Sequence, residues 1–150
     1  MTYDVTFVEL SEQPTAVRRG HVSHLGIAEF LGGAFGAVAA ALAESGLEPA
    51  GPPFAKYDVA PDGGWIVEAG FPVADPVVGN GDVEPSSLPG GTVAQTVHEG
   101  PYDGLRAAYE ALEAFIAEAG MTSRDAAWES YLDDPMTAEV PHTLVTMACS

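Results

Sequence analysis

The sequence has few basic residues, a single cysteine and no long hydrophobic run. It carries 5 lysine and arginine residues against 22 aspartate and glutamate residues, which gives a formal net charge of −17 at pH 7. An acidic surface repels phosphate groups, so we expect no direct binding of nucleic acid and no attraction to anionic membranes. The charge supports a cationic ligand only weakly, because strong acidity is also a common route to solubility.

The other absences narrow the class of protein further. The lone cysteine, Cys149, rules out an internal disulfide and suggests a reducing compartment. Residues 1–10 lack the basic and apolar regions of a signal peptide, and the apolar stretch around 34–43 is too short to span a bilayer. No phosphate-binding loop, GxSxG or HExxH is present. We therefore expect a soluble cytoplasmic protein that needs no cofactor.

What the sequence does contain is enough apolar material for one folded domain. Its 150 residues are 47% hydrophobic, and apolar residues recur at helical spacing over 24–45 and again between Pro101 and Gly120. Residues 74–91, rich in Gly, Pro and Asp, indicate a long connection. Strand patterns occupy the other segments: 4–10, 15–22, 54–61, 65–73, 92–98, 127–132 and 142–149.

The order of these elements repeats, which predicts an α+β fold made of two strand–helix–strand–strand units. An offset of 74 residues pairs Gly46 with Gly120 and Tyr57 with Tyr131, and an offset of 77 pairs His21 with His98. We expect a single domain over 1–150, with halves at about 1–73 and 88–150 and a linker at 74–87. Each sheet would give one face to its own helix, and the other face would form a groove at the seam between the units.

The stretch AWESYLDDP, residues 127–135, holds the first candidate for function. In a strand, Glu129 and Tyr131 share one face, while Trp128 points to the other. Burying an unpaired carboxylate costs several kcal/mol or shifts its pKa, so a buried Glu129 would have a reason to be there. From this strand alone, an edge position with Glu129 facing water is an equally good interpretation.

Four motifs in order resemble a known family over nearly the whole chain. They are WESYLDDP with the final TLVTMAC strand, GFPV at 70–73, the run Leu88-Pro89-Gly90-Gly91, and a turn with His98, Gly100, Pro101 and Tyr102. The chain resembles the GyrI-like small-molecule-binding domain, which is also the effector-binding domain of the BmrR multidrug regulator and of some AraC-type regulators. The resemblance implies a curved antiparallel sheet with two main helices and a pocket between pseudo-symmetric halves.

The resemblance also implies where a ligand would lie. The glutamate matching Glu129 lies on the pocket floor among aromatic rings and meets cationic, planar, apolar ligands, which aromatic faces and a desolvated carboxylate would attract. No helix-turn-helix precedes the domain in this sequence, so a stand-alone member is expected. Such members include passive drug binders, gyrase-interacting proteins and hydrolases of cyclopropane-bearing genotoxins.

Seven residues are candidates for this site. Glu129 would hold the charge, and Tyr57, the counterpart of Tyr131, would face it across the seam. For the aromatic candidates, core packing or plain exposure is the alternative to ligand contact. The ligand-binding set is Glu129, Tyr131, Tyr57, Trp65, Phe71, Tyr102 and Tyr109. No metal site is expected, because His21, His24, His98 and His142 are not joined by Cys or carboxylates at ligand spacing.

Two functions from different classes remain open. The first is a binding module for small hydrophobic or cationic aromatic molecules. The second is a hydrolase in which Glu129 is the general base for a water, with Tyr57 or Tyr102 orienting that water or stabilising the oxygen that gains charge. A third hypothesis is gyrase binding through the acidic surface, in which Glu129 would be dispensable. The sequence favours the binding module, because that function asks less of the residues.

Overall fold

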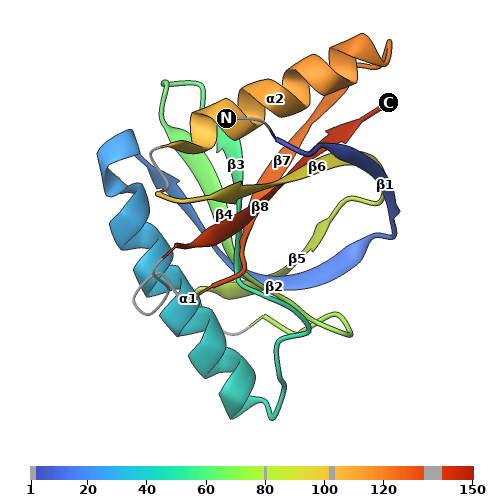
Figure 1. Cartoon of the computed structure of the whole chain (residues 1–150). Helices are drawn as coiled ribbons and strands as arrows, with labels where there is room; N and C mark the ends of the chain where they lie inside the picture. The colour runs from blue at the N-terminus through green and yellow to red at the C-terminus, as the bar shows by residue number, and fades with distance from the viewer. Residues whose placement is uncertain (1–2, 80, 102–103, 134–139) are drawn as a thin grey trace. The chain divides into compact units, whose positions relative to one another are not determined.

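The chain folds into two compact units, which are described separately (Figure 1). The structure is a computed structural model that describes residues 3–79, 81–101, 104–133 and 140–150, apart from the side chains of His24 and Asp125. Residues Glu12–Leu88 form one unit, which we call the α1 unit. Met1–Ser11 and Pro89–Ser150 form the other, the α2 unit.

The α1 unit packs one helix on a four-stranded antiparallel sheet. Its strands lie in the order β3-β4-β2-β5. Helix α1 places Ala34, Val38 and Leu42 against the sheet, and a buried cluster joins Val38 and Leu42 to Ala16, Val73 and Val83. The elements are β2 (Gln13–Val22), the 3-10 turn η1 (His24–Gly26), α1 (Ile27–Glu44), β3 (Phe54–Val59), β4 (Trp65–Pro72) and β5 (Val83–Leu88).

The α2 unit has the same plan. Its antiparallel sheet has the order β1-β6-β8-β7, and helix α2 buries Leu105, Ala108, Leu112 and Ile116 against Ala94, Val145, Met147 and Cys149. The elements are β1 (Thr6–Leu10), β6 (Gly91–Glu99), α2 (Leu105–Glu118), β7 (Ser123–Tyr131) and β8 (His142–Cys149). The α+β fold with two main helices and duplicated units is as the sequence predicts.

The two units exchange their edge strands. β1 precedes β2 in the chain but pairs with β6 of the α2 unit, and β5 precedes β6 but pairs with β2 of the α1 unit. This exchange is where the sequence prediction differs from the structure. The stretch 74–91 was expected to be a connection, yet it contains β5. The strand was missed because Pro85 and two serines interrupt the apolar pattern that a strand usually shows. The compact units therefore differ from the predicted halves in their first strands.

The repeat at an offset of 74 residues is confirmed by matching backbone features. Gly46 and Gly120 follow α1 and α2 with φ of 70° and 75°. Phe54 and Trp128 are both buried, with 2% and 3% of their surface exposed. Tyr57 lies opposite Val67 in β4, as Tyr131 lies opposite Thr143 in β8.

The offset of 77 residues for the first strand of each unit is wrong by one. Val67 lies opposite Gly20 in β2, and Thr143 lies opposite His98 in β6, so the counterpart of His98 is Gly20, an offset of 78. A one-residue shift moves a strand side chain to the other face of its sheet. His21 is therefore not equivalent to His98.

Helix α1 meets the length and composition of a membrane span, contrary to the expectation for residues 34–43. It is 18 residues long with a mean hydropathy of 1.5, the one helix in the described part of the chain to pass this test. The core helices of many soluble proteins have the same length and composition. Here the face with Ala34, Val38 and Leu42 packs on the sheet of its own unit.

We expect Gly120→Ala to lower the free energy of unfolding by about 1 kcal/mol. The residue has a φ of 75°, a left-handed conformation that costs a side chain roughly 1–2 kcal/mol, and a Cβ there would meet no atom within 4 Å. The substitution therefore changes the backbone strain at this position without introducing a steric clash. Urea unfolding measures the change, with Gly32→Ala as the control: Gly32 lies inside α1 with equal space, so alanine there should stabilise. Equal destabilisation by both substitutions would contradict this reasoning.

Candidate functional site

Glu129 lies two residues before the end of β7, on the face that α2 covers. Ala127, two residues earlier on the same face, packs in the α2 core cluster, and the register partner of Glu129 is the fully buried Val145 of that cluster. We expected the site on the face away from the helix. That expectation is wrong for Glu129, while Trp128 does point to the opposite face and is buried there, as predicted.

Both oxygens of the Glu129 carboxylate accept a hydrogen bond from a tyrosine. The Tyr109 hydroxyl, from α2, donates to Oε2 at 2.6 Å, and the Tyr131 hydroxyl, from the same strand, donates to Oε1 at 2.9 Å. Only 8% of the Glu129 surface is exposed. The interpretation in which Glu129 faces water is therefore wrong, because the carboxylate is buried and both of its oxygens are hydrogen-bonded.

Burial raises the pKa of Glu129 above its ordinary value. The low-polarity surroundings disfavour the charged form, and this effect exceeds the opposing effects of the Tyr109 hydroxyl, the Tyr131 hydroxyl and His98. A carboxyl group in this state takes up a proton at a higher pH than a surface glutamate does. It can also act as the counter-charge of a cation that enters its surroundings.

His98 is a second buried polar group on the α2 side of the sheet. Its Nε2 lies 2.9 Å from the Pro101 carbonyl oxygen, so Nε2–H donates there, and the Tyr3 hydroxyl lies 2.9 Å from Nδ1. In the neutral ring this makes Nδ1 the acceptor of the Tyr3 proton. A Cβ at Gly104 would lie 3.0 Å from the His98 ring, so this glycine lets the start of α2 approach the imidazole.

Thr143 adds a hydroxyl to the same face. It is fully buried and is the register partner of both His98 and Tyr131. Within the described residues its Oγ1 has no hydrogen-bond partner. Sequence patterns gave no reason to select Thr143 or Tyr3, because the former reads as an ordinary strand residue and the latter lies 95 residues from His98.

At the positions equivalent to Glu129, His98 and Tyr109, the α1 unit carries apolar residues. The repeat places Ala55 at the position of Glu129, Gly20 at that of His98 and Phe35 at that of Tyr109. A Cβ at Gly20 would come within 2.4 Å of the Phe30 ring, so an aromatic side chain occupies the space. Duplication of the fold therefore does not require the buried acid, which belongs to one half alone.

The α1 unit instead pairs aromatic rings. Tyr57 and Trp65 meet edge to face with centroids 6.1 Å apart, and Phe35 of α1 meets Phe71 of β4 at 6.1 Å. All four rings are partly exposed. Of the predicted site residues, Glu129, Tyr131 and Tyr109 come together in the α2 unit, and Tyr57, Trp65 and Phe71 lie in the α1 unit. Tyr102 lies outside the described residues.

The remaining histidines with described side chains, His21 and His142, each lie beside a carboxylate and are partly or fully exposed. His142 Nδ1 lies 2.5 Å from Asp133, with Glu99 at 3.6 Å from Nε2, and His21 lies 3.0 Å from Asp62. Hydrogen bonds from the Gly64 amide and His21 lower the pKa of Asp62. In the described part of the chain, no three His, Cys, Asp or Glu side chains gather as metal ligands would.

The two units, each with one helix on an antiparallel sheet, make this a duplicated α+β fold. The chain belongs to the GyrI-like small molecule binding domain family, whose sequence profile matches residues 3–147. No curated protein sequence matches it significantly.

Solved structures share the fold at low sequence identity. The C-terminal domain of EcmrR is 19% identical with a TM-score of 0.82, covering 100% of this chain and 99% of that one. A hydrolase from Listeria innocua is 14% identical with a TM-score of 0.69, covering 98% of this chain and 92% of that one. SAV2435 bound to tetraphenylphosphonium is 14% identical with a TM-score of 0.64, covering 100% of this chain and 94% of that one.

Proposed function

We propose that this protein binds lipophilic aromatic cations and that Glu129 is the counter-charge. The observation that carries the proposal is a carboxylate with 8% exposure, held by two tyrosine hydroxyls, in the half of a duplicated fold that alone has an acid there. The family supports a small-molecule ligand. The tetraphenylphosphonium complex of a protein with this fold supports a cation with aromatic rings.

The energies favour a charged ligand. Burying an unpaired carboxylate costs several kcal/mol, and the two hydroxyls offset only part of that cost, since the pKa of Glu129 is still raised. A cation at about 4 Å would gain roughly 4 kcal/mol at an effective dielectric constant of 20, and each aromatic face adds about 0.5–2 kcal/mol. Tyr109 and Tyr131 supply rings beside the charge. Tyr57, Trp65, Phe71 and Tyr102 remain predicted ligand contacts.

The decisive experiment compares tetraphenylphosphonium with tetraphenylborate, two ions of the same shape and opposite charge. The wild type is expected to bind the cation, and Glu129→Gln is expected to bind it at least tenfold more weakly, because the amide keeps the shape but loses the charge. Titration calorimetry measures both ions on both proteins. Glu68→Gln is a control that removes a carboxylate bonded to Ser86 in the α1 unit. Equal affinity of wild type and Glu129→Gln for the cation would refute the proposal.

A hydrolase is the second candidate, supported by the raised pKa of Glu129 and by the neighbour described as a hydrolase. In this reaction Glu129 takes a proton from water, the water oxygen bonds to a ring carbon, and a cyclopropane C–C bond breaks with its electrons moving into a conjugated carbonyl. The enolate formed in this way takes the proton back from Glu129, so the product has gained one water and Glu129 is ionised again. Incubation with a cyclopropane-conjugated dienone, followed by mass spectrometry, separates the two functions: turnover that Glu129→Gln abolishes identifies an enzyme, and binding without product identifies a binding module.

A further inference from the structure

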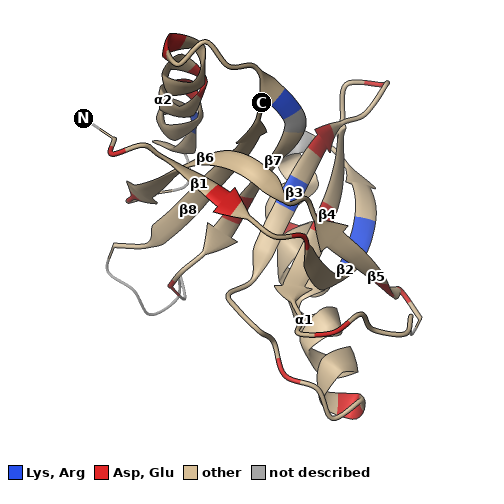
Figure 2. Ribbon diagram, turned by 90° about the vertical axis from the view of Figure 1, so that its right-hand side faces the viewer, with Lys and Arg blue, Asp and Glu red and all other residues tan. Residues whose placement is uncertain are grey.

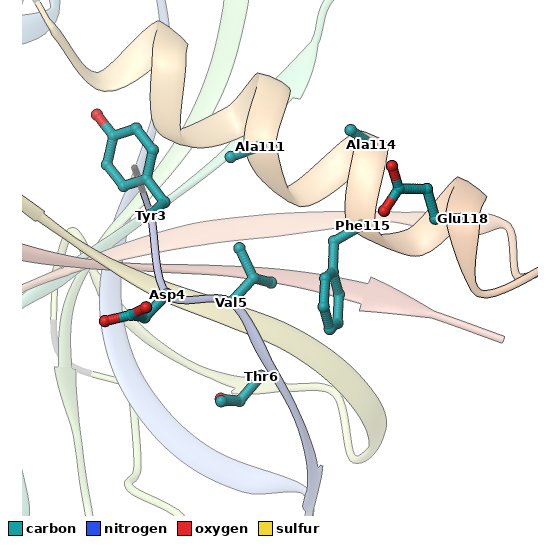
Figure 3. Close-up of a pocket in the computed structure, with 8 residues that line it drawn as sticks. All are labelled: Tyr3, Asp4, Val5, Thr6, Ala111, Ala114, Phe115 and Glu118. Carbon is teal, nitrogen blue, oxygen red and sulfur yellow. The ribbon is translucent and has the colours of Figure 1, made fainter. Parts of the chain in front are cut away.

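A groove runs between the N-terminal strand segment and α2, apart from the Glu129 carboxylate. Residues 3–6 line it on one side, and Ala111, Ala114, Phe115 and Glu118 of α2 line the other, around a volume of about 580 Å³. Figure 3 shows the side chains of Val5 and Phe115 directed into the space between strand and helix. Phe7 extends this apolar floor, with its ring 4.8 Å from that of Phe115 and 38% of its surface exposed.

Beside this groove lies an open strand edge. β1 is the last strand of its sheet, and within the described residues no strand pairs with its outer side. Natural edge strands usually carry proline, lysine or a bulge that prevents further pairing. The edge strand β5 of the α1 unit has Pro85, whereas β1, with the sequence TFVEL, has no proline, lysine or bulge, and Glu9 is its one charged residue.

The negative charge around the groove favours a positively charged segment as the strand that pairs with β1. Asp4 and Glu118 are exposed at the groove, no basic residue lines it, and the whole chain carries −17. Basic residues are sparse on the ribbon (Figure 2). By sequence they are Arg18 and Arg19 in β2, Lys56 in β3, Arg106 in α2 and Arg124 in β7. A second copy of the chain would bring the same acids to the same edge and be repelled. A cationic segment would be attracted.

We propose that the outer edge of β1 and the adjoining groove bind an extended, cationic segment of a partner protein by strand addition. Val5 and Phe7 face α2, while Asp4 and Thr6 lie on the other face of the strand. An added strand has the same alternation. Its apolar side chains therefore meet Val5, Phe7 and Phe115, and its lysine or arginine side chains lie on the face of Asp4. Glu118, which lines the groove on α2, adds to the attraction of the cationic segment as a whole.

The test uses a synthetic seven-residue peptide of alternating lysine and valine with blocked ends. Its fluorescence anisotropy is measured with wild type, with Asp4→Lys/Glu118→Lys, and with the control Glu44→Lys/Glu84→Lys, which makes the same charge change at exposed acids of the α1 unit. We expect binding at least tenfold weaker for the first double variant than for the control. We also expect slower amide hydrogen exchange at Thr6–Leu10 on binding, with β5 unchanged.

A second peptide separates strand addition from simple charge attraction. It has the same sequence but is N-methylated at its three central residues, which removes backbone donors and keeps the side chains. We expect it to lose at least tenfold in affinity. The proposal is overturned if the methylated peptide binds equally well, if both double variants weaken binding equally, or if sedimentation shows a dimer whose β1 amides are already protected without peptide.

Discussion

Affinity for tetraphenylphosphonium is expected to fall about tenfold for each pH unit below the raised pKa of Glu129, down to the affinity of Glu129→Gln. Only the ionised carboxylate attracts the cation, and below its pKa the ionised fraction falls tenfold per unit. Because burial raises this pKa, the loss begins at a higher pH than for a surface glutamate. Calorimetry in buffers of different ionisation enthalpy measures both the affinity and the proton released on binding.

The stability of the free protein should respond to pH in the opposite sense. The folded pKa of Glu129 lies above its unfolded value, so the folded state binds more protons between the two values. Stability from this group is therefore fully present below the unfolded pKa and is lost as pH rises through the folded pKa. Glu129→Gln removes this loss, so the variant should gain stability relative to wild type as pH rises.

Affinity for the cation and stability of the free protein are thus expected to change with pH in opposite directions. This distinguishes a glutamate that serves binding from one that serves stability. A glutamate retained for stability would make the Gln variant less stable at neutral pH and leave cation binding unchanged. A glutamate retained for a ligand makes the free protein less stable and binding stronger. Thermal unfolding of both proteins across pH, with and without tetraphenylphosphonium, measures both quantities on the same samples. Parallel pH curves for wild type and variant would contradict the raised pKa.

The sequence predicted the pairing of Glu129 with Tyr131 but not the face on which they lie. Period-two alternation alone places residues 129 and 131 together. Which face the helix covers depends on tertiary packing, because Ala127 and Trp128 are both apolar and either face of β7 could be the buried one. The hydrogen bond from Tyr109 to Glu129 could not be predicted either, because it joins a helix to a strand 20 residues later and depends on how the two pack.

The offset of the repeat was predicted correctly where glycines mark the ends of the helices. It was predicted wrongly where the match rested only on two histidines. Gly46 and Gly120 need a left-handed conformation after a helix, so their offset of 74 reports backbone structure. The two histidines at an offset of 77 share only an identity, and strand register contradicts them. Strand β5 was missed because Pro85 is a turn signal that an edge strand tolerates.

The exchanged edge strands predict that the two units unfold together, as a single domain over residues 1–150. The α2 unit is built from two separated pieces of chain, 1–11 and 89–150, with the whole α1 unit between them. β1 can pair with β6 only if the two ends of the intervening segment, residues 12–88, lie close together. If residues 12–88 were disordered, bringing β1 to β6 would cost the entropy of closing this long loop. A folded α1 unit already holds the two ends of that segment in fixed positions, so the cost does not arise again.

Leu112→Ala in α2 and Val38→Ala in α1 test this cooperativity, since both side chains are fully buried. We expect Leu112→Ala to lower the free energy of unfolding by about 2–5 kcal/mol and Val38→Ala by a smaller amount, because leucine leaves the larger cavity. In a cooperative domain each substitution shifts one shared transition, seen alike by Trp65 and Trp128 fluorescence through single-tryptophan variants. Two transitions, each moved only by the substitution in its own unit, would instead show that the units fold independently despite the exchanged strands.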